Sequence, residues 1–160
     1  MNPEITLLVH NIRSTHNVGA IFRTAEGFGV KKIILSGYTP YPELSLCSKA
    51  PACALVDGEI QSEDPRLPHI REKITSQIHK TALGAESLVP FEFYEDINDW
   101  IKENQQTENL PIIALEQSKD SVMLSEFQPP EKFALLLGEE VYGITPELLD
   151  NCDFTVEIPM

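Results

Sequence analysis

Short apolar runs alternate with segments of helical periodicity along most of the chain. Residues 5–9 and 32–36 have the length and β-branched content of strands. Between them lie a polar loop and a stretch with apolar residues three or four positions apart, which predicts an amphipathic helix. Its inward face would consist of Val18, Ile21, Phe22, Ala25 and Phe28. Residues 11–29 are therefore expected to be the loop and helix of a strand–loop–helix–strand unit.

The rest of the chain continues this alternation. Further strands are predicted at 88–94, 111–115, 133–137 and 154–158, and helices at 67–84, at 96–105 and from Thr145. The run 133–137 is apolar throughout, which is typical of a strand covered on both faces. Residues 43–68 lack a sustained period and predict an extended connection, and 121–127 are ambiguous. The pattern predicts an α/β fold, a mostly parallel sheet flanked by helices, in one domain spanning 1–160.

Composition narrows the class of protein. A chain of 160 residues with 42% hydrophobic content suits one folded domain. Without a membrane-length apolar run or a basic-then-hydrophobic N-terminus, we expect a cytoplasmic protein with no membrane span. The three cysteines and four histidines lack metal-site spacing, so no metal is expected. The net charge of −13 disfavours a basic surface for nucleic acid, yet residues 1–32 hold four basic and two acidic side chains.

Three loops lie at carboxyl ends of predicted strands, where ligands of such sheets bind: 11–17, 116–120 and 138–143. In the third loop, two glycines bracket Glu139 and Glu140 directly after a buried strand. Glycines let a backbone approach a ligand closely, although a charged solvent loop is an equal alternative. Neither GxGxxG nor GxxxxGK[ST] occurs, which disfavours dinucleotide and triphosphate binding.

The loop 11–17 carries amide side chains at both ends, with Arg13 between them. An arginine beside a helix N-terminus suits phosphate oxygens; the alternative is that Asn17 only caps the helix and Arg13 is solvated. Arg23 is expected near the rim of the buried helix face, where a guanidinium needs a partner.

Three segments, in order, resemble motifs of the SpoU branch of the SPOUT methyltransferases. They are Asn11-x-Arg13-x-x-x-Asn17-x-Gly19-x-x-x-Arg23-Thr24-Ala25, Gly138-x-Glu140-x-x-Gly143 and Ile158-Pro159-Met160. The resemblance implies a homodimer that binds S-adenosylmethionine at a trefoil-knotted C-terminal region. It also implies methyl transfer to a ribose 2′-hydroxyl of tRNA or rRNA. Because no additional RNA-binding domain is visible, tRNA is favoured over rRNA.

The same resemblance assigns roles to individual residues. The catalytic residues would be Arg23, Asn17 and Glu140; the cofactor residues Leu115, Gly138, Gly143, Ile158 and Met160; and the RNA-binding residues Asn11, Arg13 and Arg23. Glu140 would be the partner of Arg23. A guanidinium carries no free acceptor lone pair and is a poor proton acceptor, so we expect Arg23 to orient the ribose and a phosphate.

In the family, the third motif continues beyond Ile-Pro-Met into a Ser-Leu-Asn-containing loop and a helix. We therefore expect this chain to lack the C-terminal end of the domain, with part of the knot and of the cofactor pocket. The alternative function is a non-catalytic RNA-binding or dimerisation module of the same fold.

Overall fold

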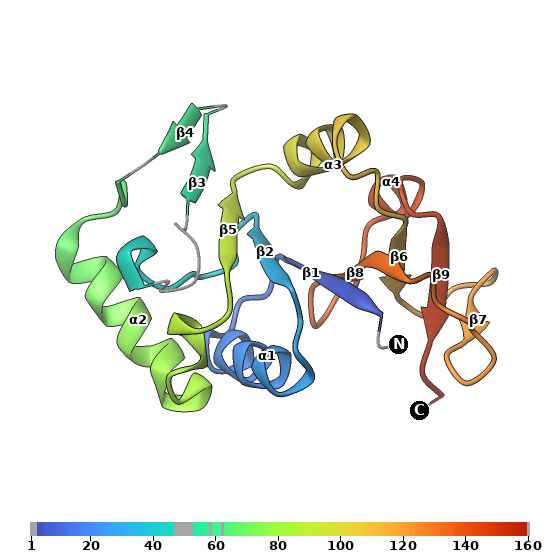
Figure 1. The fold of residues 1–160 in the computed structure, drawn as a ribbon, viewed down its shortest axis with the longest axis horizontal. Coiled ribbons are helices and arrows are strands. Elements are labelled where there is room, and N and C mark those ends of the chain that lie inside the picture. The colour runs from blue at the N-terminus through green and yellow to red at the C-terminus, as the bar shows by residue number, and fades with distance from the viewer. Residues whose placement is uncertain (1–2, 47–52, 58, 62, 160) are drawn as a thin grey trace.

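The computed structural model describes residues 3–46, 53–57, 59–61 and 63–159. Within these residues, nine strands form one sheet in the order β4-β3-β5-β2-β1-β8-β6-β9-β7 (Figure 1). The strands are β1 (Glu4–His10), β2 (Lys32–Ser36), β3 (Cys53–Val56), β4 (Glu59–Gln61), β5 (Phe91–Tyr94), β6 (Ile112–Leu115), β7 (Val122–Met123), β8 (Lys132–Leu137) and β9 (Phe154–Glu157). Neighbours pair in parallel except β3 with β4. The predicted, mostly parallel α/β sheet is confirmed.

Helices cover both faces of this sheet. They are α1 (Thr15–Phe28), α2 (Pro68–Ala82), α3 (Ile97–Gln106) and α4 (Pro146–Leu149), with short 3₁₀ turns η1 (Leu44–Leu46) and η2 (Ala85–Ser87). Helices α1 and α2 lie side by side on one face, and α3 and α4 lie on the other (Figure 1). In β1, Leu7 and Val9 belong to the core under α1 and α2, whereas Leu8 belongs to the core under α3 and α4. Burial on both faces explains the consecutive apolar residues 7–9 of this strand.

Helix α1 packs closely against the C-terminal end of α2 because Gly19 has no side chain. A Cβ at this position would collide with the carbonyl oxygen of Ile78 and with Oγ1 of Thr81. The Thr81 hydroxyl in turn donates a hydrogen bond of 2.8 Å to the His16 carbonyl. One turn along α1, Phe22 is fully buried and meets the ring of Phe91 edge-on. The two helices thus form one layer that fixes the position of α1 on the sheet.

The structure corrects three details of the sequence interpretation. Residues 43–68 are not only an extended connection, because they contain η1 and strands β3 and β4 at the sheet edge. The predicted strand 88–94 is shorter, since η2 precedes it and β5 starts at Phe91. Phe28 does not join the inward face of α1, because 83% of it is exposed at the end of the helix. Residues 47–52, 58 and 62 of the predicted connection lie outside the described residues.

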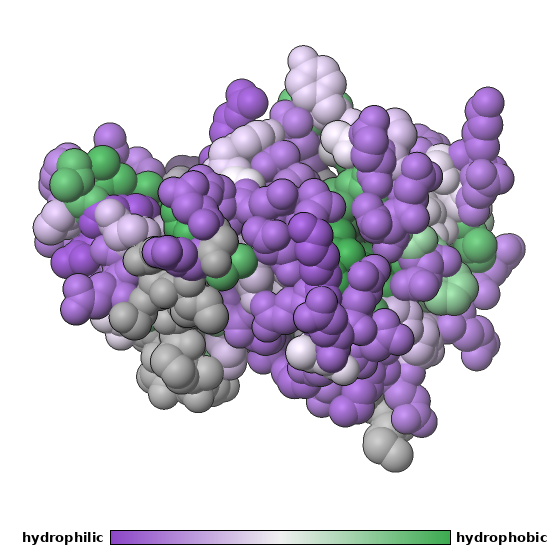
Figure 2. Space-filling view, turned by 90° about the horizontal axis from the view of Figure 1, so that it is seen from above, coloured by the Kyte–Doolittle hydropathy of each residue, from purple (hydrophilic) through white to green (hydrophobic). Residues whose placement is uncertain are grey.

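Figure 2, which views the molecule from the side on which α3 lies in Figure 1, shows a mainly hydrophilic face with scattered apolar groups. Among the described residues, no helix is long and apolar enough to cross a membrane.

Candidate functional site

The strands β1 and β8 are neighbours at the point where the chain changes direction across the sheet. From β1 the chain passes through α1 to β2, and from β8 it passes through α4 to β9, on the opposite side. Because α1 and α4 cover opposite faces, the two loops diverge at the carboxyl ends of the strands. A crevice at such a switch point is the usual ligand site of an open parallel sheet. The loops in question are 11–14 and 138–145.

Side chains of the two loops contact each other directly. The Asn17 carboxamide donates a hydrogen bond of 3.0 Å to Oε1 of Glu140, and the Arg13 backbone N–H donates a longer one of 3.5 Å to Oε2. The Arg13 guanidinium also lies 3.8 Å from the carboxylate of Glu139. Because the Arg13 side chain is mostly exposed, this ion pair adds little stability. The structure therefore brings together two of the predicted catalytic residues, Asn17 and Glu140.

The environment of Glu140 keeps it ionised. Partial burial alone would raise its pKa, but hydrogen bonding by the Asn17 side chain and by the Arg13 backbone lowers the pKa below its usual value. The carboxylate also lies at the first turn of α1, where the helix dipole favours negative charge. An ionised carboxylate only accepts hydrogen bonds. Glu140 is therefore suited to orient Asn17 and is not a proton donor at neutral pH.

The N-cap of α1 is Ser14, not Asn17. Ser14 has extended backbone angles, and its Oγ accepts the N–H of Asn17 at 3.2 Å. Asn17 thus lies in the first turn of the helix, with its side chain free to bind Glu140. The alternative that Asn17 only caps the helix is wrong.

Replacing Ser14 and Asn17 one at a time should distinguish the residue that caps α1 from the residue that binds Glu140. We expect Ser14→Ala to lower the free energy of unfolding by about 1 kcal/mol, as for other lost N-caps. Asn17→Ala should cost less stability, because the bond it loses is solvent-exposed. It should, however, shift the pKa of Glu140 upward toward its ordinary value. Urea unfolding measures the loss of stability, and NMR titration of the carboxylates measures the pKa of Glu140. Equal losses of unfolding free energy in the two variants, with an unchanged Glu140 pKa, would contradict the assignment of Ser14 as the cap and of Asn17 as the partner of Glu140.

Arg23 does not pair with Glu140. Its side chain is exposed on α1, and among the described residues it has no hydrogen bond or ion pair. Arg23 comes six positions after Asn17 on the helix, which places it about 9 Å further along the axis. The predicted pairing of Arg23 with Glu140 is therefore wrong. The expectation that Arg23 lies at the rim of the buried helix face, where it would need a partner within the chain, is also wrong.

The loop after β1 also forms hydrogen bonds with the turn after β2. Asn11 has a left-handed backbone (φ 57°), and its side-chain oxygen accepts the N–H of Tyr38 at 3.2 Å. The Thr39 hydroxyl accepts the N–H of Ile12 at 3.1 Å and donates to the Ser36 carbonyl at 2.7 Å. Asn11, predicted to bind RNA, therefore also positions the loop. Tyr38 and Thr39 were not predicted; their only signal is the Gly-x-Thr-Pro turn.

The predicted cofactor residues line two adjoining hollows. Leu115, Gly138 and Gly143 line the first hollow, of about 320 Å³, together with residues 139–142. Leu115 and Ile158 line the second hollow, of about 260 Å³, with Gln117 and Glu157. Leu115 and Glu116 belong to both hollows. The first volume is at the lower end of the range for small-molecule sites, and the second lies just below that range. Met160, the fifth predicted cofactor residue, lies outside the described residues.

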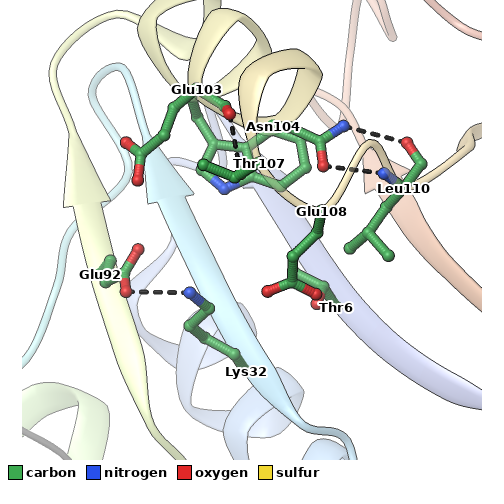
Figure 3. Close-up of a pocket in the computed structure, with 9 residues that line it drawn as sticks. Thr6, Lys32, Glu92, Glu103, Asn104, Thr107, Glu108 and Leu110 are labelled. Atoms are coloured by element: carbon green, nitrogen blue, oxygen red, sulfur yellow. Dashed lines mark hydrogen bonds and ion pairs between the residues drawn. The ribbon is translucent and has the colours of Figure 1, made fainter.

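A further pocket on the α3 face is a weaker candidate. It encloses only about 50 Å³, and Figure 3 shows that its polar groups already pair with one another. Lys32 binds Glu92 at 2.9 Å, and the Asn104 side chain donates to and accepts from the backbone of Leu110. Lys32 is the first residue of β2, so the pocket lies at the amino ends of the strands. Within the described part of the chain, no three His, Cys, Asp or Glu side chains are grouped to hold a metal ion.

Comparisons with known proteins agree with this geometry. Residues 66–160 match the model of the SpoU rRNA methylase family. The chain is 24% identical over 161 residues to the 23S rRNA (guanosine-2′-O-)-methyltransferase RlmB of Coxiella burnetii, covering 99% of this chain and 50% of the relative. It is also 24% identical over 158 residues to the tRNA (guanosine(18)-2′-O)-methyltransferase of Escherichia coli K12, covering 99% and 54%. The chain thus spans about half the length of these relatives.

A solved structure shows the same fold. The AdoMet-bound rRNA methyltransferase of Sinorhizobium meliloti superposes with a TM-score of 0.70 at 21% identity, covering 100% of this chain and 50% of that one. AdoMet is S-adenosylmethionine.

Proposed function

Because the chain belongs to the SpoU rRNA methylase family, we propose that it transfers a methyl group from S-adenosylmethionine to a ribose 2′-hydroxyl of RNA. The observation that carries the proposal is the contact between Asn17 and Glu140 beside the first hollow. It joins the two segments whose residue pattern resembles the family's first and second motifs. The named relatives that methylate guanosine at the 2′-oxygen support the same reaction.

The two hollows would hold the cofactor. Their shared residues Leu115 and Glu116 make them continuous, and Leu115 and Ile158 offer apolar surface to an adenine ring. Gly138 keeps the loop closed over the first hollow, because a Cβ there would collide with the side chain of Ile144. When bound, S-adenosylmethionine would supply an electrophilic methyl group to the ribose 2′-oxygen. S-adenosylhomocysteine would be the leaving group, and the hydroxyl proton would pass to a phosphate oxygen of the RNA or to solvent. The protein's task is therefore mainly to align the ribose hydroxyl.

Arg13 and Arg23 would align the RNA. Both guanidinium groups are exposed, and a guanidinium fork fits phosphate oxygens. A guanidinium only donates hydrogen bonds, so Arg23 would orient the ribose and a phosphate and would not remove the hydroxyl proton. Glu140, held ionised, fixes Asn17 at the start of the helix that carries Arg23.

We further propose a homodimer that prefers tRNA to rRNA. In support of a dimer, Arg23 has no hydrogen bond or ion pair with Glu140 or with the hollows of its own chain, among the described residues. A site assembled from two copies would bring the arginine to the cofactor. The tRNA preference is supported by the Escherichia coli relative that modifies guanosine 18 of tRNA.

Cofactor binding and methyl transfer test the proposal. We expect calorimetry to detect S-adenosylmethionine binding at micromolar Kd, and tritiated methyl groups to appear in tRNA, with less in rRNA. Sedimentation should give twice the chain mass. RNA binding without cofactor binding or transfer would contradict the enzyme and favour the non-catalytic module. A Lys102→Ala variant on α3, which lies on the opposite face, should behave as the wild type.

A further inference from the structure

Glu116 begins the predicted ligand loop 116–120, but neither the residue pattern nor the resemblance assigned it a role of its own. It directly follows β6, and its half-buried side chain borders both hollows. Both carboxylate oxygens accept backbone hydrogen bonds. Oε2 accepts the N–H of Ile144 at 2.8 Å, and Oε1 accepts the N–H of Gln117 at 2.9 Å. Bonds from amides to an ionised acceptor are stronger than those to a neutral one.

The carboxylate reaches Ile144 because of Gly143. Gly143 has a left-handed backbone (φ 69°), and a Cβ at this position would collide with the Glu116 carboxylate. The N–H of Gly143 bonds to the Glu139 carbonyl at 3.0 Å, which closes the loop on itself. The second glycine of the loop therefore serves two purposes: it permits the turn and it leaves room for Glu116.

The 138–144 loop is thus held at two points. On the α1 side, Glu140 binds Asn17 and the backbone of Arg13. On the β6 side, Glu116 binds Ile144 and packs against Gly143. Loss of the contact between Glu116 and Ile144 would let the 138–144 loop move relative to β6. The wall of the first hollow and Glu140 belong to this loop and would move with it.

We infer that Glu116 is a positioning residue: its carboxylate fixes the end of the 138–144 loop and thereby sets the shape of the cofactor hollow and the place of Glu140. The part that concerns the cofactor rests on the proposed function. The part that concerns the loop is independent of any ligand.

The loop itself provides the first test. We expect Glu116→Ala to speed amide hydrogen exchange at Ile144 by at least about tenfold, because a hydrogen bond to a charged group is lost. Glu116→Gln should lie between the wild type and the alanine variant, since its amide oxygen still accepts one N–H. Lys119→Ala changes an exposed side chain in the 116–120 loop, which also contains Glu116. It is the matched control and should leave the exchange at Ile144 unchanged. Unaltered exchange at Ile144 in Glu116→Ala would overturn the inference.

A double-mutant cycle tests the contact with Gly143. Gly143→Ala alone should also speed exchange at Ile144, because its Cβ displaces the carboxylate. In the Glu116→Ala background, the same change should have a smaller effect, since only the backbone strain remains. Additive effects would show that Glu116 and Gly143 act independently and would contradict the proposed packing.

Calorimetry with S-adenosylmethionine separates this inference from the proposed function. We expect about tenfold weaker binding in Glu116→Ala and partial rescue in Glu116→Gln, with the unfolding free energy of Glu116→Gln close to that of the wild type. A purely structural role would change stability and not affinity. Unchanged affinity despite faster exchange would overturn the positioning role. Absence of binding in the wild type would refute the proposed cofactor, whereas the exchange data would still decide the role of Glu116 in the loop.

Discussion

Replacing Arg23 with alanine is expected to lower the rate of methyl transfer by about 10²–10³-fold, the usual effect of removing one electrostatic contact to the reacting group. The affinity for S-adenosylmethionine should not change, because Arg23 does not line either hollow. Single-turnover transfer of tritiated methyl groups to tRNA measures the rate, and calorimetry measures the affinity.

Two further variants make the Arg23 experiment specific. Arg23→Lys keeps the charge but not the planar fork, so an intermediate rate is expected. Lys102→Ala removes one exposed charge from α3, on the opposite face of the sheet, and should leave the rate unchanged. Full activity of Arg23→Ala would remove this residue from the mechanism.

Gly19→Ala is expected to destabilise the fold by about 1–3 kcal/mol, the range found for overpacked cores. The new Cβ would collide with the carbonyl oxygen of Ile78, which is backbone and cannot rotate away. Separation of α1 from α2 would also weaken the bond from Thr81 to His16. Urea unfolding measures the loss.

Gly27 offers a matched control on the same helix. A Cβ at Gly27 would meet nothing within 4 Å, so Gly27→Ala should gain helix propensity and stabilise by up to about 1 kcal/mol. Opposite signs for the two Gly→Ala changes are therefore expected. If both variants are stabilised, the close packing of α1 against α2 is wrong.

The sequence predicted those features that depend on local patterns. The apolar runs predicted the strands β1 and β8, and the continuous apolar run of β8 predicted cover on both faces. The polar loops after these strands were two of the three predicted ligand loops. The helix predicted at 96–105 is α3, and Asp96 caps it, with its side chain accepting the N–H of Asn98. In each case, neighbours within a few residues determine the structure.

What the sequence could not predict depends on distant partners. Helical periodicity placed Phe28 on the inward face because it gives only the angle of a residue around the helix axis. Phe28 is the last residue of α1, and its side chain is exposed there. The burial of Gly19 depends on α2, almost sixty residues away. The resemblance suggested that Glu140 pairs with Arg23, whereas the loop brings it to Asn17. Glu116 was predicted only as the first residue of a ligand-binding loop, because its partner Ile144 is reached only through the fold.

The central position of β1 has a consequence for the order of folding. On one edge, β1 pairs with β2, which follows within one helix; on the other edge it pairs with β8, near the far end of the chain. Pairing between such distant segments requires a large loop to close, and that slows folding. During synthesis from the N-terminus, β1, α1 and β2 can assemble early. The other edge of β1 then remains open until β8 has been made, so the crevice between their loops is among the last parts of the molecule to form.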